Sequence, residues 1–165
     1  DENSTLDLDS QSLKKIDYGI ISFHPQVYRG EILSDYTSIL IKALENPYIN
    51  IIAHLGNPRY PVDYPLIVKK AIDYNKVIEI NNSSFHISRK GSLENCKMIA
   101  QEIKKHGGYI IVTSDAHYCD EVGDYQLSLD LLESINFPKE YIINASPTMF
   151  QSFLNSFLKI RGRER

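Results

Sequence analysis

The stretch INIIAHLGNP, residues 49–58, joins a short apolar run to a polar turn that begins with a histidine. A five-residue run rich in β-branched residues has the length and composition of a buried parallel strand. Similar runs occupy residues 18–23, 77–81 and 109–113. Segments with a helical spacing of apolar residues lie between the runs, at 32–45, 64–74 and 92–105. This alternation predicts an α/β fold in which helices cross over between consecutive parallel strands.

The spacing of the strands supports this prediction. The ends of the four runs recur at intervals of about 30, 28 and 31 residues, the length of one strand plus one helix. The helix over 92–105 is expected to have Ser92 as its N-cap and to stop at Gly107. After the fourth strand the sequence predicts a helix over 121–134, a short extended segment over 141–144, and a last helix that opens at Ser146-Pro147.

Composition and charge narrow the class of protein. The chain has 165 residues, 42% of them hydrophobic, and its 18 Lys and Arg against 21 Asp and Glu give a net charge of −3. This length predicts one domain or part of a larger one, and the dispersed basic residues argue against a broad nucleic-acid-binding face. No apolar run approaches the ~20 residues that span a bilayer, and two cysteines make no disulfide framework. We therefore expect a soluble protein of the cytoplasm.

Histidines follow three of the four predicted strands. His24 ends the first strand, His54 ends the second, and the fourth runs into Ser114-Asp115-Ala116-His117. A single histidine at a strand end is ordinarily a hydrogen-bonded polar cap. Adjacent parallel strands, however, lie ~4.8 Å apart and end at the same edge of a sheet, so neighbouring side chains can share one ion. Imidazole and carboxylate suit zinc, iron or manganese, and the pattern predicts a metal site.

Cations near a helix start are candidates for binding an anionic substrate. Arg89 and Lys90 precede the helix expected from residue 92, where free backbone N–H groups favour an anion such as phosphate. Asn57-Pro58-Arg59 forms a second turn of this kind. A solvated basic turn is an equally good interpretation of each. The sequence contains no P-loop, Gly-rich dinucleotide motif or Ser-His-Asp elbow.

Five motifs together are more informative than any one of them. They are FH at 23–24, IAHLGNPRY at 52–60, EINNSSF at 79–85, SRKGS at 88–92 and SDAH at 114–117. With these motifs the chain resembles the polymerase and histidinol phosphatase (PHP) family of metal-dependent phosphoesterases, in particular its YcdX-like phosphatase branch. The resemblance covers nearly the whole chain. It implies part of a distorted (β/α)7 TIM-like barrel, about the last four βα units.

The resemblance also implies roles for individual residues. His24 and His54 match histidines that share one metal. Asp115 matches a ligand of a second metal and His117 a ligand of the third, which makes these two the candidate catalytic residues. The implied cofactors are divalent metal ions, zinc or else iron or manganese, three in the full-length protein.

One part of the family pattern is absent from this sequence. The H-x-H motif and the bridging glutamate of the family's N-terminal strands have no counterpart here. We therefore expect residues 1–165 to be the C-terminal part of a single PHP barrel domain. Four strands cannot close a seven-stranded barrel, so an open edge and an apolar interior face are expected to meet water. Self-association, or pairing with the missing N-terminal half, is the expected consequence.

The expected activity of the full-length protein is hydrolysis of a small phosphomonoester by a metal-bound hydroxide. Arg89 and Asn57 are the candidate substrate-binding residues, and the fragment alone is expected to be inactive. Two alternatives stay open. One is a non-catalytic metal-binding or interaction module, and the other is a TIM-like metal-dependent hydrolase of the amidohydrolase type. The resemblance also favours a bacterial protein without membrane association.

Overall fold

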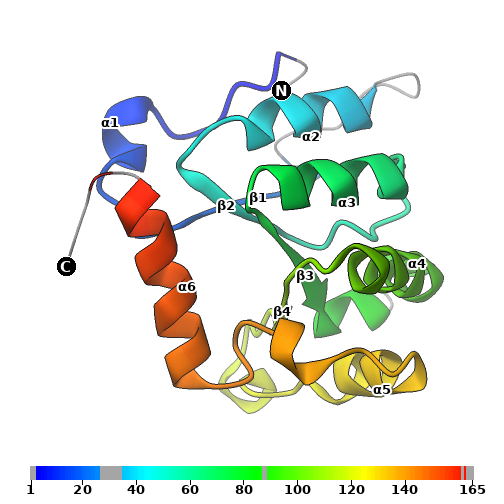
Figure 1. The fold of residues 1–165 in the computed structure, drawn as a ribbon. Coiled ribbons are helices and arrows are strands. Elements are labelled where there is room, and N and C mark those ends of the chain that lie inside the picture. The colour runs from blue at the N-terminus through cyan, green and yellow to red at the C-terminus, as the bar shows by residue number, and fades with distance from the viewer. Residues whose placement is uncertain (1–2, 27–34, 87–88, 161, 163–165) are drawn as a thin grey trace.

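A computed structural model describes residues 3–26, 35–86, 89–160 and 162. In it, parallel strands form one four-stranded sheet in the order β1-β2-β3-β4 (Figure 1). The strands are β1 (Gly19–Ile21), β2 (Ile49–Ile52), β3 (Val77–Asn81) and β4 (Ile110–Thr113). The predicted α/β class is confirmed, and the sheet is compatible with part of a TIM-like barrel.

Helices alternate with the strands, as the sequence predicts. The helices that follow β1 to β4 in turn are α2 (Tyr36–Leu44), α3 (Tyr64–Asp73), α4 (Ser92–His106) and α5 (Gln126–Ser134). The other helical elements are α1 (Ser10–Leu13), α6 (Pro147–Ile160) and the short 3₁₀ helices η1 (Asn82–Phe85), η3 (Cys119–Glu121) and η4 (Lys139–Tyr141). Of the helix predicted over 32–45, residues 32–34 lie outside the described residues.

The start of α4 differs from the prediction by one residue. Its N-cap is Gly91, with a left-handed φ of 97°, and it has no side-chain cap. Ser92 is instead the first helical residue, and its hydroxyl donates to the carbonyl of Arg89 at 2.7 Å. The left-handed backbone explains why a glycine stands at this turn. Gly107, with φ 74°, ends the helix as predicted.

The segment after β4 also departs from the prediction. The helix expected over 121–134 begins only at Gln126, because η3 and a left-handed turn at Gly123, with φ 88°, come first. The extended segment expected over 141–144 is reduced to one parallel bridge between Ile110 and Ile142. The last helix does open at Ser146-Pro147, where the Ser146 hydroxyl accepts from the Met149 N–H at 3.2 Å.

The two faces of the sheet are covered differently. The main apolar core lies between the sheet and α2, α3, α4 and α5, and α6 lies on the other side of the sheet (Figure 1). There Phe150 and Phe153 of α6 pack against a small cluster formed by Ile51, Val77, Ile111 and Ile143. The expectation that the inner apolar face meets water is therefore wrong for this cluster, which α6 shields. Ile20 of β1 remains 54% exposed.

Candidate metal site at the strand ends

The structure brings His24 and His54 together. His24 follows β1 and His54 follows β2, and their Nε2 atoms lie 3.2 Å apart with the rings nearly perpendicular, at 86°. One tetrahedral ion bound to two imidazoles at ~2.0–2.1 Å separates their nitrogen atoms by about 3.3 Å. The geometry of this pair fits a shared metal ion.

The electrostatic surroundings of His54 favour its metal-binding form. The side chain is 6% exposed. Burial, followed by the charge of Arg89 and by the neighbouring His24, lowers the pKa of His54 to about 4. The imidazole is therefore neutral at neutral pH. A neutral imidazole has the nitrogen lone pair that a metal needs.

The backbone of His54 is held in an unusual conformation by Glu79. His54 has a left-handed φ of 34°, and its N–H donates to Oε2 of Glu79 at 2.7 Å. Glu79 also accepts from Asn81 Nδ2 at 3.2 Å and from the Thr113 hydroxyl at 2.7 Å. Burial raises the pKa of Glu79, and these hydrogen bonds oppose the shift. Glu79 is not among the predicted site residues, although an acid inside an otherwise apolar strand is a signal of a buried polar site.

Asp115 is fixed by Arg89. Both terminal nitrogens of the guanidinium lie 3.1 Å from Oδ2 of Asp115. Burial alone would raise the pKa of Asp115, but hydrogen bonds from Asn81 and Arg89 and the charge of Arg89 bring it below its ordinary value. Arg89 also donates to Asn81 Oδ1 and Ser84 Oγ, at 3.3 and 3.4 Å. The proposed phosphate-binding role of Arg89 stays a prediction.

His117 is exposed, but its ring is oriented. Its Nδ1 lies 2.8 Å from the carbonyl oxygen of Asp115. A carbonyl only accepts, so Nδ1 carries the proton and Nε2 carries the lone pair. The backbone N–H of His117 donates to Glu121 Oε2 at 2.8 Å. This arrangement leaves Nε2 as the ligating atom.

The predicted ligands do not form one cluster. Within the part of the chain that the structure describes, no group of three or more His, Cys, Asp or Glu side chains is placed to hold a metal. The described residues instead supply the His24–His54 pair and, separately, Asp115 with His117. Asn57 lies in the turn after β2, where its Oδ1 accepts from the Arg59 N–H at 3.1 Å. Its role in substrate binding is not tested by this arrangement.

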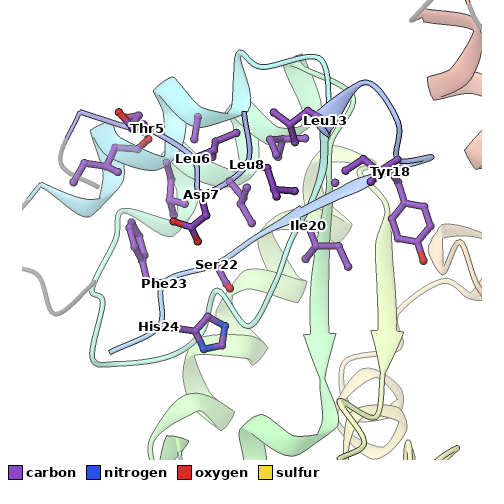
Figure 2. Close-up of a pocket in the computed structure, with 18 residues that line it drawn as sticks. Thr5, Leu6, Asp7, Leu8, Leu13, Tyr18, Ile20, Ser22, Phe23 and His24 are labelled. Atoms are coloured by element: carbon purple, nitrogen blue, oxygen red, sulfur yellow. Dashed lines mark hydrogen bonds between the residues drawn. The ribbon is translucent and has the colours of Figure 1, made fainter. Parts of the chain in front are cut away.

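A cavity of about 320 Å³ leads to His24, one member of the histidine pair. It runs along β1, the edge strand of the described sheet, and is closed on one side by residues 4–8. Figure 2 shows His24 at one end of this cavity and Tyr18 at the other, with Asp7 above Ser22 and Phe23. His24 is therefore bordered by open space, whereas His54 is buried.

Comparison with known proteins gives a consistent group of relatives. The chain is 43% identical over 163 residues to a protein named "Probable phosphatase" from Caldanaerobacter subterraneus. The aligned region covers 98% of this chain and 64% of that protein. It is 37% identical over 155 residues to a probable phosphatase from Shewanella loihica, and the aligned region covers 94% of this chain and 63% of that protein. A third, from Caldicellulosiruptor bescii, is 42% identical over 164 residues, covering 99% and 66%. All three are named as probable phosphatases.

These relatives are longer than the chain. The chain spans just under two thirds of the length of each of the three. No protein-family model matches it. Among the described residues, no helix is both long and apolar enough to span a membrane.

Proposed function

We propose that this chain is the C-terminal part of a metal-dependent phosphatase of the PHP type that hydrolyses phosphomonoesters. The observation that carries the proposal is the His24–His54 pair, with 3.2 Å between Nε2 atoms at the ends of two parallel strands. The similarity to proteins named probable phosphatases supports it. In this proposal residues 1–165 supply about the last four βα units of a distorted (β/α)7 barrel.

Different side chains at the strand ends would bind different metal ions. His24 and His54 would hold one divalent ion, zinc or else iron or manganese. Asp115 and His117 would contribute to two further ions, whose other ligands would come from the missing N-terminal part. When bound, such ions supply Lewis-acid activation of a water molecule and of the phosphoryl group. Neutral His54 and the Nε2 of His117 offer lone pairs, and Arg89 holds Asp115 through one oxygen, which leaves Oδ1 for a metal.

The rest of the barrel would complete the site. The preceding strand would pair with the free edge of β1, along the cavity that ends at His24. Such pairing would place the N-terminal ligands next to the histidine pair. The substrate would be a small phosphorylated molecule of the cytoplasm. Arg89 and Asn57 would bind it.

The test is a phosphatase assay on the full-length protein. We expect hydrolysis of p-nitrophenyl phosphate that is abolished by a chelator and restored by Zn²⁺ or Mn²⁺. A His54→Asn variant should lose this activity, and a variant at the exposed Lys69 of α3, Lys69→Ala, should keep it. Activity that survives complete metal removal would contradict the proposal, and hydrolysis of amide substrates alone would favour an amidohydrolase instead.

One observation favours a second function for the chain by itself. Because the described residues hold no group of three metal ligands, a chain without the N-terminal part is suited to binding one ion weakly and not to turnover. A metal-binding module without phosphatase activity is the expected behaviour of the isolated chain.

A further inference from the structure

Glu79 is a buried acid that the proposed chemistry does not use. It lies in the middle of β3 and is 7% exposed. Its three hydrogen bonds all come from neutral donors: the His54 N–H, the Asn81 amide and the Thr113 hydroxyl. None of the described cations forms an ion pair with it. A buried carboxylate without a cation is costly, so its presence calls for a specific role.

Glu79 connects the ends of three neighbouring strands. Oε2 accepts from His54, just beyond β2, while Oε1 accepts from Thr113, the last residue of β4. Asn81, at the end of β3, donates to Glu79 and accepts from Arg89, whose guanidinium also donates to the Asp115 carboxylate. One side chain is thus linked to both halves of the proposed metal site.

Both halves depend on strained backbone. His54 has φ 34° and Asp115 has φ 54°, and neither is a glycine. A non-glycine residue in this region costs of order 1–3 kcal/mol and persists only where its surroundings hold it. The hydrogen bond from the His54 N–H to Glu79 is such a restraint, because releasing it would leave a buried N–H without an acceptor.

We propose that Glu79 is a positioning residue that fixes the strand ends so that His54 and Asp115 are held ready for metal ions. The inference rests on the proposed metal site. Glu79 itself contacts neither substrate nor metal in this assignment. It acts through the His54 backbone, through Thr113 and through Asn81.

Two substitutions separate positioning from charge. In Glu79→Gln the amide oxygen can accept from His54 and Asn81, and the amide NH₂ can donate to the Thr113 hydroxyl, so the network survives without the charge. In Glu79→Leu the volume is similar, but every acceptor is lost. Ile78→Val is the matched control, because it weakens the same strand on its opposite, helix-covered face.

The first measurement is Co²⁺ binding to the chain, followed by the visible absorption of the bound ion, with circular dichroism to confirm folding. We expect Glu79→Leu to bind Co²⁺ 10–100-fold more weakly, the range typical of residues that orient metal ligands. Glu79→Gln and Ile78→Val should bind within a few-fold of wild type, with an unchanged spectrum. Equal affinity of wild type and Glu79→Leu would overturn the inference, as would a Glu79→Gln variant as weak as Glu79→Leu.

The second measurement needs no metal. Amide hydrogen exchange should be faster at residue 54 in Glu79→Leu than in wild type, relative to the amides of α3, and unchanged in Glu79→Gln. An unaltered exchange rate at residue 54 in Glu79→Leu would overturn the positioning role. If wild type binds no Co²⁺, the proposed metal site fails, while hydrogen exchange still decides the role of Glu79.

Discussion

At the scale of single residues, the strand-end site is a set of side chains whose charge states are set by their neighbours. Burial and Arg89 lower the pKa of His54, and Asn81 together with Arg89 lowers the pKa of Asp115. The same guanidinium therefore favours the metal-binding form of both groups. A neutral imidazole and a carboxylate are the states that a divalent metal requires.

The lowered pKa of His54 makes the stability of the metal-free chain depend on pH. Between pH 6.5 and about 4 the unfolded chain protonates residue 54 and the folded chain does not, so acidification favours unfolding. The stability of wild type relative to His54→Asn should fall by up to about 3 kcal/mol across this window. Asparagine tolerates the left-handed backbone and does not titrate. Urea unfolding at several pH values gives the free energy of unfolding of both proteins. If the two free energies change with pH in parallel, the expectation is refuted.

The influence of Arg89 on His54 can be measured directly. Removing its charge in Arg89→Ala should raise the pKa of His54, since the guanidinium is the second largest cause of its lowering after burial. Histidine ring signals followed by NMR against pH give the midpoint. Arg59→Ala, at an exposed position outside this network, is the control and should leave the midpoint in place. A midpoint that does not respond to Arg89→Ala would show that the two groups are uncoupled.

At the scale of elements, the turn after β2 is packed tightly onto α4. A Cβ at Gly56 would lie 2.6 Å from Sγ of Cys96. The Asn95 side chain also donates to the Gly56 carbonyl at 2.9 Å. These contacts set the position of the turn that follows His54.

Gly56→Ala should therefore destabilise the chain by about 1–3 kcal/mol, the usual cost of overpacking. Cys96→Ala should relieve part of this cost, so the double variant should be more stable than the sum of the single effects allows. Chemical denaturation of wild type, the two single variants and the double variant gives the coupling free energy between positions 56 and 96. Strict additivity would mean that Cys96 is not the obstacle.

Elements were predictable from sequence where periodicity was strong. The four strands, α3 and the start of α6 follow directly from runs of apolar residues and from Ser146-Pro147. The prediction was wrong where a local turn overrides periodicity, as at Gly123 before α5 and at Gly91 before α4. The pairing of His24 with His54 was predictable because parallel strands end at one edge. The hydrogen bonds of Glu79 were not predictable, because their donors, the His54 N–H after β2 and the Thr113 hydroxyl at the end of β4, are distant in sequence.

At the scale of the whole molecule, α6 covers the face of the sheet opposite α2, α3, α4 and α5 (Figure 1). It shields the small apolar cluster there, and Phe153 packs edge-on against Phe157 with 4.3 Å between ring centroids. The periodicity of α6 predicts an apolar stripe for docking, but not which face of the sheet receives it. In the proposed barrel this face would look inward.

Phe153→Ala should destabilise the chain by about 1–3 kcal/mol, less than for a fully buried phenylalanine because Phe153 is only half-buried. It should also increase binding of a hydrophobic dye, since Ile51, Val77 and their neighbours lose cover. Ser152→Ala, at an exposed position on the same helix, is the matched control and should change neither property. Equal stability of the two variants would place α6 elsewhere.

Equilibrium dialysis against Zn²⁺, with elemental analysis of both compartments, tests the His24–His54 site most directly because it gives the zinc bound per chain while free Zn²⁺ is present. We expect about one zinc per wild-type chain, and none in His24→Asn or His54→Asn variants that remain folded by circular dichroism. Wild type without zinc, or variants that retain it, would contradict a metal site at the His24–His54 pair.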